Sequence, residues 1–562
     1  MARNAQGGEC STQPVFAKKR KRDDAATEVA HASEGALPAP TAASLPPPRR
    51  PLPPHQLVLA PMVGGSELAF RLLARRHGAQ LCYTPMMRCE DFSRPGAGIA
   101  LLERHAADAP VVAHFSGNDP AKLLAVAKKA EQCEGVVAID LNLGCPQRSA
   151  HSGHFGAFLL DPPDRTLVLR IVSTLARSLR VPFFCKIRLL EDLDDTLQFV
   201  SQLQDAGCAL LAVHGRYRGS PMHRRDGPAH LDQIALIKRR LTIPVITNGN
   251  VRDPAEMLAS LEQTGADGVM SAEGALDDPA IFGRAVALAH SEGRRLRSAI
   301  RRAKRLRAER IESGRKLTAD EKACVAARKE AKARVRRLSA LLSLPFPPGG
   351  EVAAQDHEER AAGASTAAAP DAASTAPFDL AEQYLRLVAA HPPPGGRDAL
   401  MAHAIFHLRR IVKEPLTRFQ LRPALEACTS LDAAATIIRR CRAFDEGSLP
   451  YDANAEAEHQ QAQALEARRA ANAARRAEFV TRMEAKALKE GRAADWYLRA
   501  GRTPPSDADL EAARRLKSPK ERARWWRERF GQHCHGHYLE GACPHHADPR
   551  GCGFLHGDSD EL

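Results

Sequence analysis

Three features are missing from this 562-residue sequence, and each absence removes a class of protein. No stretch approaches the roughly 20 consecutive apolar residues that a membrane-spanning helix requires. The N-terminus carries no apolar signal core, so we expect no secretion. The 13 cysteines are odd in number and mostly scattered singly, which is typical of a reducing compartment rather than of a disulfide framework. We therefore expect a cytoplasmic and/or nuclear protein that does not bind membranes.

Positive charge, in contrast, is in excess. The net formal charge is +14 and the isoelectric point is about 9.3. Such an excess indicates a polyanionic partner, RNA or DNA in the first place, whereas a basic disordered tail without function is the alternative. A chain of this length is too long for one hydrophobic core and predicts several domains.

Composition divides the chain into segments. Residues 1–54 are rich in Ala, Pro and Ser and are expected to form a disordered arm. Within the arm, Lys18 to Arg22 resembles a nuclear-import signal, or else is a solvated basic run. The remaining predicted segments are a barrel (55–292), a basic helical segment (293–345), a linker (346–377), a small helical bundle (378–450), an Ala/Arg/Glu-rich helical stretch (451–530) and a Cys/His-rich end (531–562).

The segment 55–292 alternates short apolar runs with amphipathic stretches of helical length. This alternation predicts parallel βα units, and eight units of this size match a TIM (β/α)8 barrel. We therefore predict an α/β fold, in which the barrel precedes an all-α domain. The expected strands lie in residues 57–63, 81–87, 110–117, 135–144, 182–189, 210–216, 243–250 and 268–274.

Polar residues gather where these strands end, which is the place of the active site in TIM barrels. Any one of them is compatible with a satisfied polar residue at the barrel rim, but the set is hard to explain by packing. Glycine-containing turns after the last two strands predict a phosphate site and hence a phosphorylated cofactor. The strand-end residues are Ala60, Pro61 and Met62; Asn142, Gly144, Cys145 and Pro146; Lys186 and Arg188; His214 and Arg216; Asn248, Gly249 and Asn250; and Ala272, Glu273 and Gly274.

These motifs, "LAPMV", "DLNLGCPQ", "GAFLL", "CKIRL", "VHGR" and "ITNGNV…GADGVMSAEGAL", follow one another at barrel spacing. Together they resemble the flavin-dependent tRNA-dihydrouridine synthases. "GCPQ" followed by "GHFGAFLL" is most similar to the eukaryotic branch that modifies uridines 16 and 17 of the tRNA D loop. The resemblance implies FMN as cofactor, NAD(P)H as reductant and tRNA as substrate. We also expect the protein to be a monomer.

The resemblance also assigns roles to single residues. Cys145, whose alternative is a buried inert cysteine, becomes the proton donor for C5 of uracil, because a thiol is largely protonated at neutral pH. Asn142 is implied to bind the uracil edge. The flavin itself is implied to contact Ala60, Pro61, Met62, Lys186 and His214, and its phosphate Asn248, Gly249, Asn250, Ala272 and Glu273. Arg188 and Arg216 are implied to meet RNA phosphate or flavin phosphate.

Two positions depart from the family's pattern. His114 stands where the family usually has Gln, which leaves its flavin contact open. Ala272 and Glu273 stand where many members have Gly-Arg, so the phosphate relies more on backbone donors. The basic segment 293–345 and the helical domain 378–450 are expected to bind the tRNA backbone, the alternative for the former being a solvated helix.

The end of the chain carries a C-x8-C-x8-C-x3-H spacing formed by Cys534, Cys543, Cys552 and His556. Three thiolates and one imidazole make a closed tetrahedral Zn²⁺ site, and the pattern resembles CCCH zinc fingers. An unstructured Cys/His tail is the alternative. For the whole protein, two other functions stay open: a flavin barrel that acts on a free pyrimidine, and a catalytically inactive RNA-binding protein.

Overall fold

The computed structural model describes residues 50–94, 98–218, 227–344 and 374–457, scattered positions between 462 and 491, and residues 505–516, 518–530 and 535–540. The segment Lys18 to Arg22 and the predicted zinc ligands Cys534, Cys543, Cys552 and His556 lie outside the described residues. No helix in the described part of the chain is long and apolar enough to cross a membrane.

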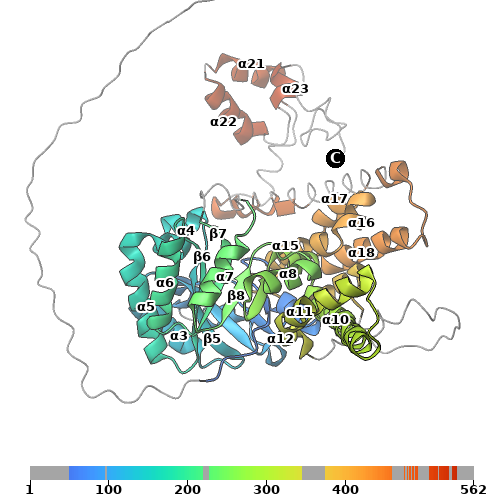
Figure 1. Cartoon of the computed structure of the whole chain (residues 1–562). Coiled ribbons are helices and arrows are strands. Elements are labelled where there is room, and N and C mark those ends of the chain that lie inside the picture. Colours follow the sequence, from blue (N-terminus) through green and yellow to red (C-terminus); the bar gives the residue numbers. More distant parts are fainter. Residues whose placement is uncertain are drawn as a thin grey trace, which may run out of the picture. The chain divides into compact units, whose positions relative to one another are not determined.

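Eight parallel strands form a closed barrel with helices on its outside (Figure 1). The strand order runs β2-β1-β9-β8-β7-β6-β5-β4, and pairing of β2 with β4 closes the ring. Each predicted run coincides, to within a few residues, with one of these eight strands, which confirms the TIM barrel. The strands are β1 (Leu57–Leu59), β2 (Leu81–Tyr83), β4 (Val111–Ser116), β5 (Val136–Leu143), β6 (Phe183–Leu189), β7 (Leu210–Tyr217), β8 (Val245–Asn248) and β9 (Gly268–Ser271). A two-residue strand, β3 (Met87–Arg88), additionally pairs with β4.

Capping residues begin several of the outer helices. Asp119 and Asp253 cap helices that have proline in their first turn, and Asp192 accepts a hydrogen bond from Asp195 N. Gly265 ends α8 in the left-handed conformation that glycine adopts without strain. The helices are α1 (Leu68–Arg76), α3 (Pro120–Ala130), α5 (Arg165–Ser178), α6 (Leu193–Asp205), α7 (Leu231–Arg240), α8 (Pro254–Thr264) and the short α2 (Cys89–Phe92), α4 (Arg148–Ser152) and α9 (Glu273–Asp277), with 3-10 turns η1 (Ile99–Leu102), η2 (Ala106–Asp108), η3 (Gly156–Leu160) and η4 (Pro162–Asp164).

The barrel interior changes character along its axis. Successive side chains of a strand point to opposite faces, so every second residue enters the interior. Toward the amino ends of the strands, apolar residues such as Val58, Phe184 and Met270 fill the interior. Farther along the same strands the inward positions are polar. They are His114 and Ser116 on β4, Asp140 and Asn142 on β5, Lys186 and Arg188 on β6, His214 and Arg216 on β7, and Asn248 on β8.

A helical hairpin follows the barrel. It consists of α10 (Ile281–Ser313) and α11 (Ala319–Arg337), which pack against each other (Figure 1), and of the short α12 (Ser339–Leu342). Helix α10 continues without interruption through residues 292 and 293, where we predicted a domain boundary. A capping box between Thr318 and Glu321 begins α11.

A bundle of five helices lies within residues 377–445. Its apolar faces join α1 and the last part of the barrel in one hydrophobic core. The helices are α14 (Pro377–Ala390), α15 (Gly396–Ile411), α16 (Lys413–Arg418), α17 (Arg422–Glu426) and α18 (Leu431–Asp445). Nearer the C-terminus, α21 (Asp507–Arg515) contacts α22 (Pro519–Phe530) and α23 (His535–Glu540).

A buried carboxylate joins the barrel to this bundle. Glu67, directly before α1, accepts a hydrogen bond of 2.8 Å from the Tyr384 hydroxyl and one of 3.1 Å from His407 Nε2. The His407 ring stacks on Phe70 with 4.2 Å between ring centres. Burial by itself raises the pKa of Glu67, but the charge and hydrogen bonds of these partners outweigh it and lower the pKa to about 2. The ionised carboxylate therefore stabilises the docked bundle.

We predict that Glu67→Gln lowers the free energy of unfolding at pH 7 by about 2–4 kcal/mol, because it breaks a buried charged hydrogen-bond network. The pKa of Glu67 in the folded protein lies below the ordinary 4.5. The stabilisation by the ionised carboxylate is therefore complete above pH 4.5 and is lost as the pH falls toward 2. The difference in melting temperature between the wild type and Glu67→Gln should therefore become smaller as the pH falls. Tyr384→Phe keeps the carboxylate and is the control, with an expected cost of about 1.5–3 kcal/mol for one hydrogen bond to a charged group. A destabilisation by Glu67→Gln that stays the same on acidification contradicts the prediction.

Candidate active site

The turn that carries Cys145 is held by the side chain of Asn142. Its Oδ1 accepts hydrogen bonds from the backbone N–H groups of Gly144 (2.9 Å) and Cys145 (3.0 Å), a local arrangement for which asparagine is suited. The amide nitrogen of Asn142 contacts Met86 Sδ at 2.7 Å. On the other side, Arg188 Nε donates to the carbonyl of Gly144 at 2.9 Å. The turn after β5 is therefore fixed by two neighbouring strands.

A second segment packs directly on Cys145. Ala157 N donates to the Cys145 carbonyl at 3.0 Å. Gly156 has φ +68°, and a Cβ there would lie 2.8 Å from Cys145 O and 3.1 Å from Cys145 Cβ. Only glycine suits this position without displacement. Cys145 is partly exposed and packs at the edge of a small cluster with Phe155 and Phe158. The cysteine is thus held at the carboxyl end of the barrel and remains accessible.

Lys186 enters the barrel interior from β6. Its Nζ donates to Asn248 Oδ1 at 3.1 Å, and the Asn248 amide donates to Met270 O at 2.9 Å. Burial, aided by the nearby charge of Arg188, lowers the pKa of Lys186 to about 8, while Asp140 and Cys145 act in the opposite direction. At neutral pH most of the lysine is still a cation, held where a bound anion would stabilise it.

His214 is neutral in this site. Arg216 Nη1 lies 3.0 Å from His214 Nε2, and an arginine can only donate, so Nε2 is the acceptor. Burial, together with the charges of Lys186, Arg188 and Arg216, lowers the pKa of His214 well below its ordinary value. Arg216 Nη2 also donates to Asn250 Oδ1 at 2.7 Å, so β7 and the turn after β8 are joined.

Gly249 lies in this turn with φ +111°, and a Cβ there would lie 2.8 Å from Ala229 Cβ and 3.1 Å from His214 Cδ2. The backbone of the turn therefore approaches the His214 ring more closely than any other residue allows. The predicted phosphate-binding residues 248–250 thus lie beside His214 and Arg216.

His114 pairs with an aspartate that we did not predict. Its Nδ1 lies 2.6 Å from Asp140 Oδ2, and both residues are buried. Burial raises the pKa of Asp140, against the opposing effect of His114 and Lys186. The other carboxylate oxygen, Oδ1, and the hydroxyls of Tyr83 and Ser116 are buried and have no hydrogen-bond partner among the described residues. Buried polar groups are normally satisfied, so these atoms indicate a place for a polar ligand.

The remaining predicted residues come from β1 and β9. Ala60 is buried and its N–H donates to Ser271 O at 3.0 Å, while Pro61 and Met62 at the end of β1 are partly buried. Ala272 follows β9 directly. Glu273, in contrast, turns its carboxylate to Arg410 on α15, with Oε2 2.7 Å from Nη2. Glu273 therefore contributes to the docking of the helical bundle, and phosphate binding at this turn would rest on backbone N–H groups.

A family model described as dihydrouridine synthase (Dus) matches residues 58–341, half of the chain. The chain belongs to the dihydrouridine synthase family. The chain is 42% identical over 231 residues to the mouse protein named tRNA-dihydrouridine(16/17) synthase [NAD(P)(+)]-like. The aligned part covers 40% of this chain and 47% of the mouse protein. For the tRNA-dihydrouridine(16/17) synthase [NAD(P)(+)] of Saccharomyces cerevisiae, the identity is 40% over 232 residues, covering 40% of this chain and 53% of the yeast protein.

The human tRNA-dihydrouridine(20a/20b) synthase [NAD(P)+]-like is 38% identical over 229 residues, which cover 40% of this chain and 70% of the human protein. The chain spans about half the length of the two 16/17 relatives that it matches. The family match itself extends from the barrel through the α10–α11 hairpin to residue 341.

The residues of this dihydrouridine synthase family member fit an FMN. Members of the family use FMN and NAD(P)H. A flavin ring needs donors and a cation near its pyrimidine edge, and its phosphate needs N–H groups or cations. Lys186, Arg188 and Arg216 supply the cations, and the unpartnered hydroxyls of Tyr83 and Ser116 supply polar contacts inside the same ring of strands. Gly249 and Ala272 follow β8 and β9 directly, where backbone N–H groups would hold the phosphate.

Sequence reasoning missed four residues of this site. Asp140 precedes Asn142 by two positions on β5 and therefore faces the same interior, so strand alternation was a usable signal. Gly156 was quoted within a motif, but its contact with Cys145 depends on how η3 packs against the turn after β5. No sequence signal marked the hydroxyls of Tyr83 and Ser116 as unpartnered, because hydrogen bonding is decided by packing.

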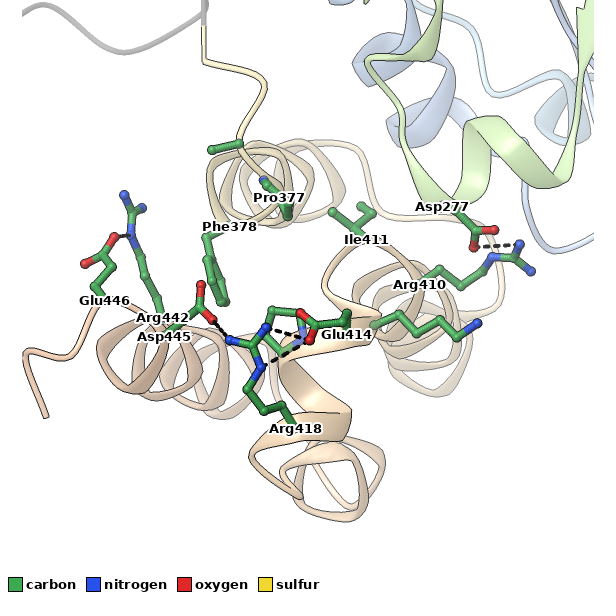
Figure 2. Close-up of a pocket in the computed structure, with 13 residues that line it drawn as sticks. Asp277, Pro377, Phe378, Arg410, Ile411, Glu414, Arg418, Arg442, Asp445 and Glu446 are labelled. Atoms are coloured by element: carbon green, nitrogen blue, oxygen red, sulfur yellow. Dashed lines mark hydrogen bonds and ion pairs between the residues drawn. The ribbon is translucent and has the colours of Figure 1, made fainter. Parts of the chain in front are cut away.

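A groove between the barrel and the helical bundle is a weaker candidate (Figure 2). Several arginines line it, yet each is paired with a carboxylate: Arg410 with Asp277, Arg418 with Glu414 and Asp445, and Arg442 with Glu446. Paired arginines have little charge left for an anionic ligand, and among the described lining residues this leaves Lys413 as a single cation without an ion pair. The groove is therefore best explained by the docking of the bundle.

We predict that Gly156→Ala destabilises the protein by about 2–4 kcal/mol, since it adds overpacking against Cys145 to the cost of a left-handed alanine. The matched control is Gly314→Ala. Gly314 has the same φ of +68° but no atom within 4 Å of the added Cβ, so about 1 kcal/mol is expected there. Denaturant unfolding measures both values, and the rate of thiol labelling at Cys145 should change only in the first variant. Equal destabilisation and unchanged labelling would show that Gly156 does not position the cysteine.

Proposed function

We propose that this protein reduces uridine to dihydrouridine in the D loop of tRNA, at positions 16 and 17, with FMN as cofactor and NAD(P)H as reductant. The observation that carries the proposal is the pinned, accessible thiol of Cys145 at the same barrel mouth as Lys186 and Arg188. The similarity to relatives named as tRNA-dihydrouridine(16/17) synthases supports the choice of substrate and position.

The reaction adds a hydride to one carbon and a proton to the other carbon of the C5=C6 double bond of uracil. Reduced FMN, when bound, supplies the hydride to C6 of uracil. Cys145 supplies the proton to C5, and the thiolate left behind takes a proton from solvent. A thiol is suited to this step because its ordinary pKa of about 8.5 keeps it protonated at neutral pH. Asn142 holds the turn so that the sulfur does not swing away from the base.

The base has to leave the RNA stack before it reaches this depth. Lys186, Asn142 and Cys145 lie at the carboxyl ends of strands, inside the barrel mouth, so a stacked base cannot reach them. Uridines of a loop are poorly stacked, which keeps the cost of extrusion small. Around the mouth, Arg188 and Arg216 supply positive charge for the phosphates of the flavin or the RNA.

The decisive experiment replaces the thiol. The purified protein should carry FMN, and Cys145→Ala should retain the flavin while dihydrouridine formation in tRNA falls by about 10²-fold or more, the range expected for loss of a general acid. Cys428→Ala, at a partly buried cysteine in the helical bundle, is the control and should remain fully active. Dihydrouridine is quantified by mass spectrometry of the tRNA, with the flavin measured by visible absorption.

Other outcomes of this experiment identify the competing functions. Full activity of Cys145→Ala removes the proposed role of the thiol. A flavoprotein that reduces free uracil or uridine but not tRNA would be a barrel enzyme of pyrimidine metabolism. A colourless protein that binds tRNA without changing it would be an inactive RNA-binding member of the family.

For the end of the chain, we propose a zinc finger formed by Cys534, Cys543, Cys552 and His556, on the basis of the sequence spacing alone. The purified protein should then contain one zinc ion per chain, because three thiolates and one imidazole saturate a tetrahedral ion. Cys543→Ser should lose the metal, whereas Cys428→Ser should keep it. Metal analysis by mass spectrometry checks both, and equal zinc contents of the two variants would exclude these ligands.

A further inference from the structure

The positive charge of this chain is concentrated on the α10–α11 hairpin. Between residues 293 and 337 there are 18 lysines and arginines against five acidic residues. This surplus of 13 positive charges is almost equal to the net formal charge of the whole chain, +14. The excess charge noted in the sequence therefore belongs to one structural element and not to residues 1–54.

Helix α10 presents a continuous row of arginines to solvent. Arg294, Arg297, Arg301 and Arg305 recur at intervals of three and four residues and are all exposed. They lie on the face opposite to Leu296, Ala303 and Leu306, which are buried. Within the described part of the chain, none of these four arginines forms an ion pair, in contrast to Arg295, Arg315 and Arg337 on the same hairpin, which pair with carboxylates.

Such a row is unfavourable for the helix itself. Like charges three or four residues apart destabilise a helix by about 0.2–0.5 kcal/mol per pair. A polyanion bound along the row removes this repulsion, and arginine is the side chain that binds phosphate oxygens best. Charge complementarity therefore favours a phosphate backbone as the partner of this face.

The hairpin is anchored to the barrel at its base. Arg334 Nε lies 2.8 Å from Glu262 on α8, and Arg334 Nη1 lies 3.3 Å from Glu292 on α10. At the same level, Gly293 is so close to α12 that a Cβ would lie 2.7 Å from Leu342 Cδ2. The cationic row is thus carried by a fixed helix rather than by a free tail.

This anchor also places the row at the end of the barrel away from the mouth. Strands of a parallel barrel all run toward the mouth, so the helix after each strand returns toward their amino ends. Glu262 is in the last turn of α8, just before β9 begins, and therefore marks that end. The part of α10 after Glu292 continues beyond it for about 30 Å, at 1.5 Å per residue. The arginines cannot touch a base that is bound at Cys145.

We propose that the exposed face of α10 binds the sugar-phosphate backbone of the same tRNA whose uridine enters the mouth, as a second contact remote from the reaction. This inference rests on the proposed function for the identity of the RNA. It makes the hairpin a substrate-binding arm that supplies affinity but no chemistry. Substitution there should raise the KM for tRNA and leave kcat unchanged.

The test compares two triple variants of the full-length protein with the same loss of charge. In the first, Arg297, Arg301 and Arg305 are replaced by Gln. In the control, the ion-paired Arg295, Arg315 and Arg337 are replaced by Gln. Flavin content and circular dichroism establish that both are folded, and tRNA binding is measured as a function of salt concentration.

We expect the first variant to lower the slope of log Kd against log salt by about 2–3, because each lost phosphate contact removes roughly 0.7–0.9. At moderate salt its Kd for tRNA should rise on the order of tenfold or more, with KM following and kcat unchanged. The control should change the slope by less than one. An equal change in both variants means that only the net charge matters and overturns the proposal.

Unchanged tRNA binding in the first variant also overturns it, and would direct attention to an acidic protein as partner. A fall in kcat without a change in KM likewise overturns the proposal, because a remote contact with the RNA backbone does not affect the chemical step. If the wild-type protein binds tRNA in the predicted way but forms no dihydrouridine, the proposed function fails while the assignment of the hairpin stands.

Discussion

The closed parallel barrel is the constraint on which the rest of this structure depends. Once β2 pairs with β4, every second residue of eight strands points into one enclosed space, and all strands end on the same side. Apolar side chains fill that space toward the amino ends, so the polar inward residues are gathered at the other end. Lys186 and His214 are brought beside each other by this geometry alone, although 28 positions of sequence separate them.

At the polar end of the barrel, burial disfavours the charged forms of the titratable side chains. Burial lowers the pKa of Lys186 and of His214 and raises that of Asp140, so each group is shifted toward its neutral form. The chain only partly compensates this cost, by hydrogen bonds such as those of Asn248 and Arg216. Residues whose charged forms are disfavoured in this way, beside hydroxyls that have no partner in the described part of the chain, are typical of a site prepared for an anionic ligand.

The helical bundle and the α10–α11 hairpin lie outside the barrel and differ in which of their surfaces are buried. The helical bundle is joined to the barrel by the buried Glu67 network and by Arg410, which takes up the carboxylate of Glu273. That pairing explains why a residue expected at the phosphate site faces the bundle instead. The hairpin, in contrast, buries one face of α10 and leaves the arginines of the opposite face exposed.

Much of the fold and part of the site followed from the sequence. The alternation of apolar runs with amphipathic stretches determined the eight strands and their closure, because each run is buried on both faces. The same order placed Cys145, Asn142, Lys186 and Arg188 at strand ends. What only the tertiary structure decided are contacts between distant segments: Gly156 against Cys145, His114 with Asp140, and Glu273 with Arg410. Local pattern determines which way a side chain points along its own strand or helix, whereas its partner depends on how separate elements pack, and no local pattern carries that information.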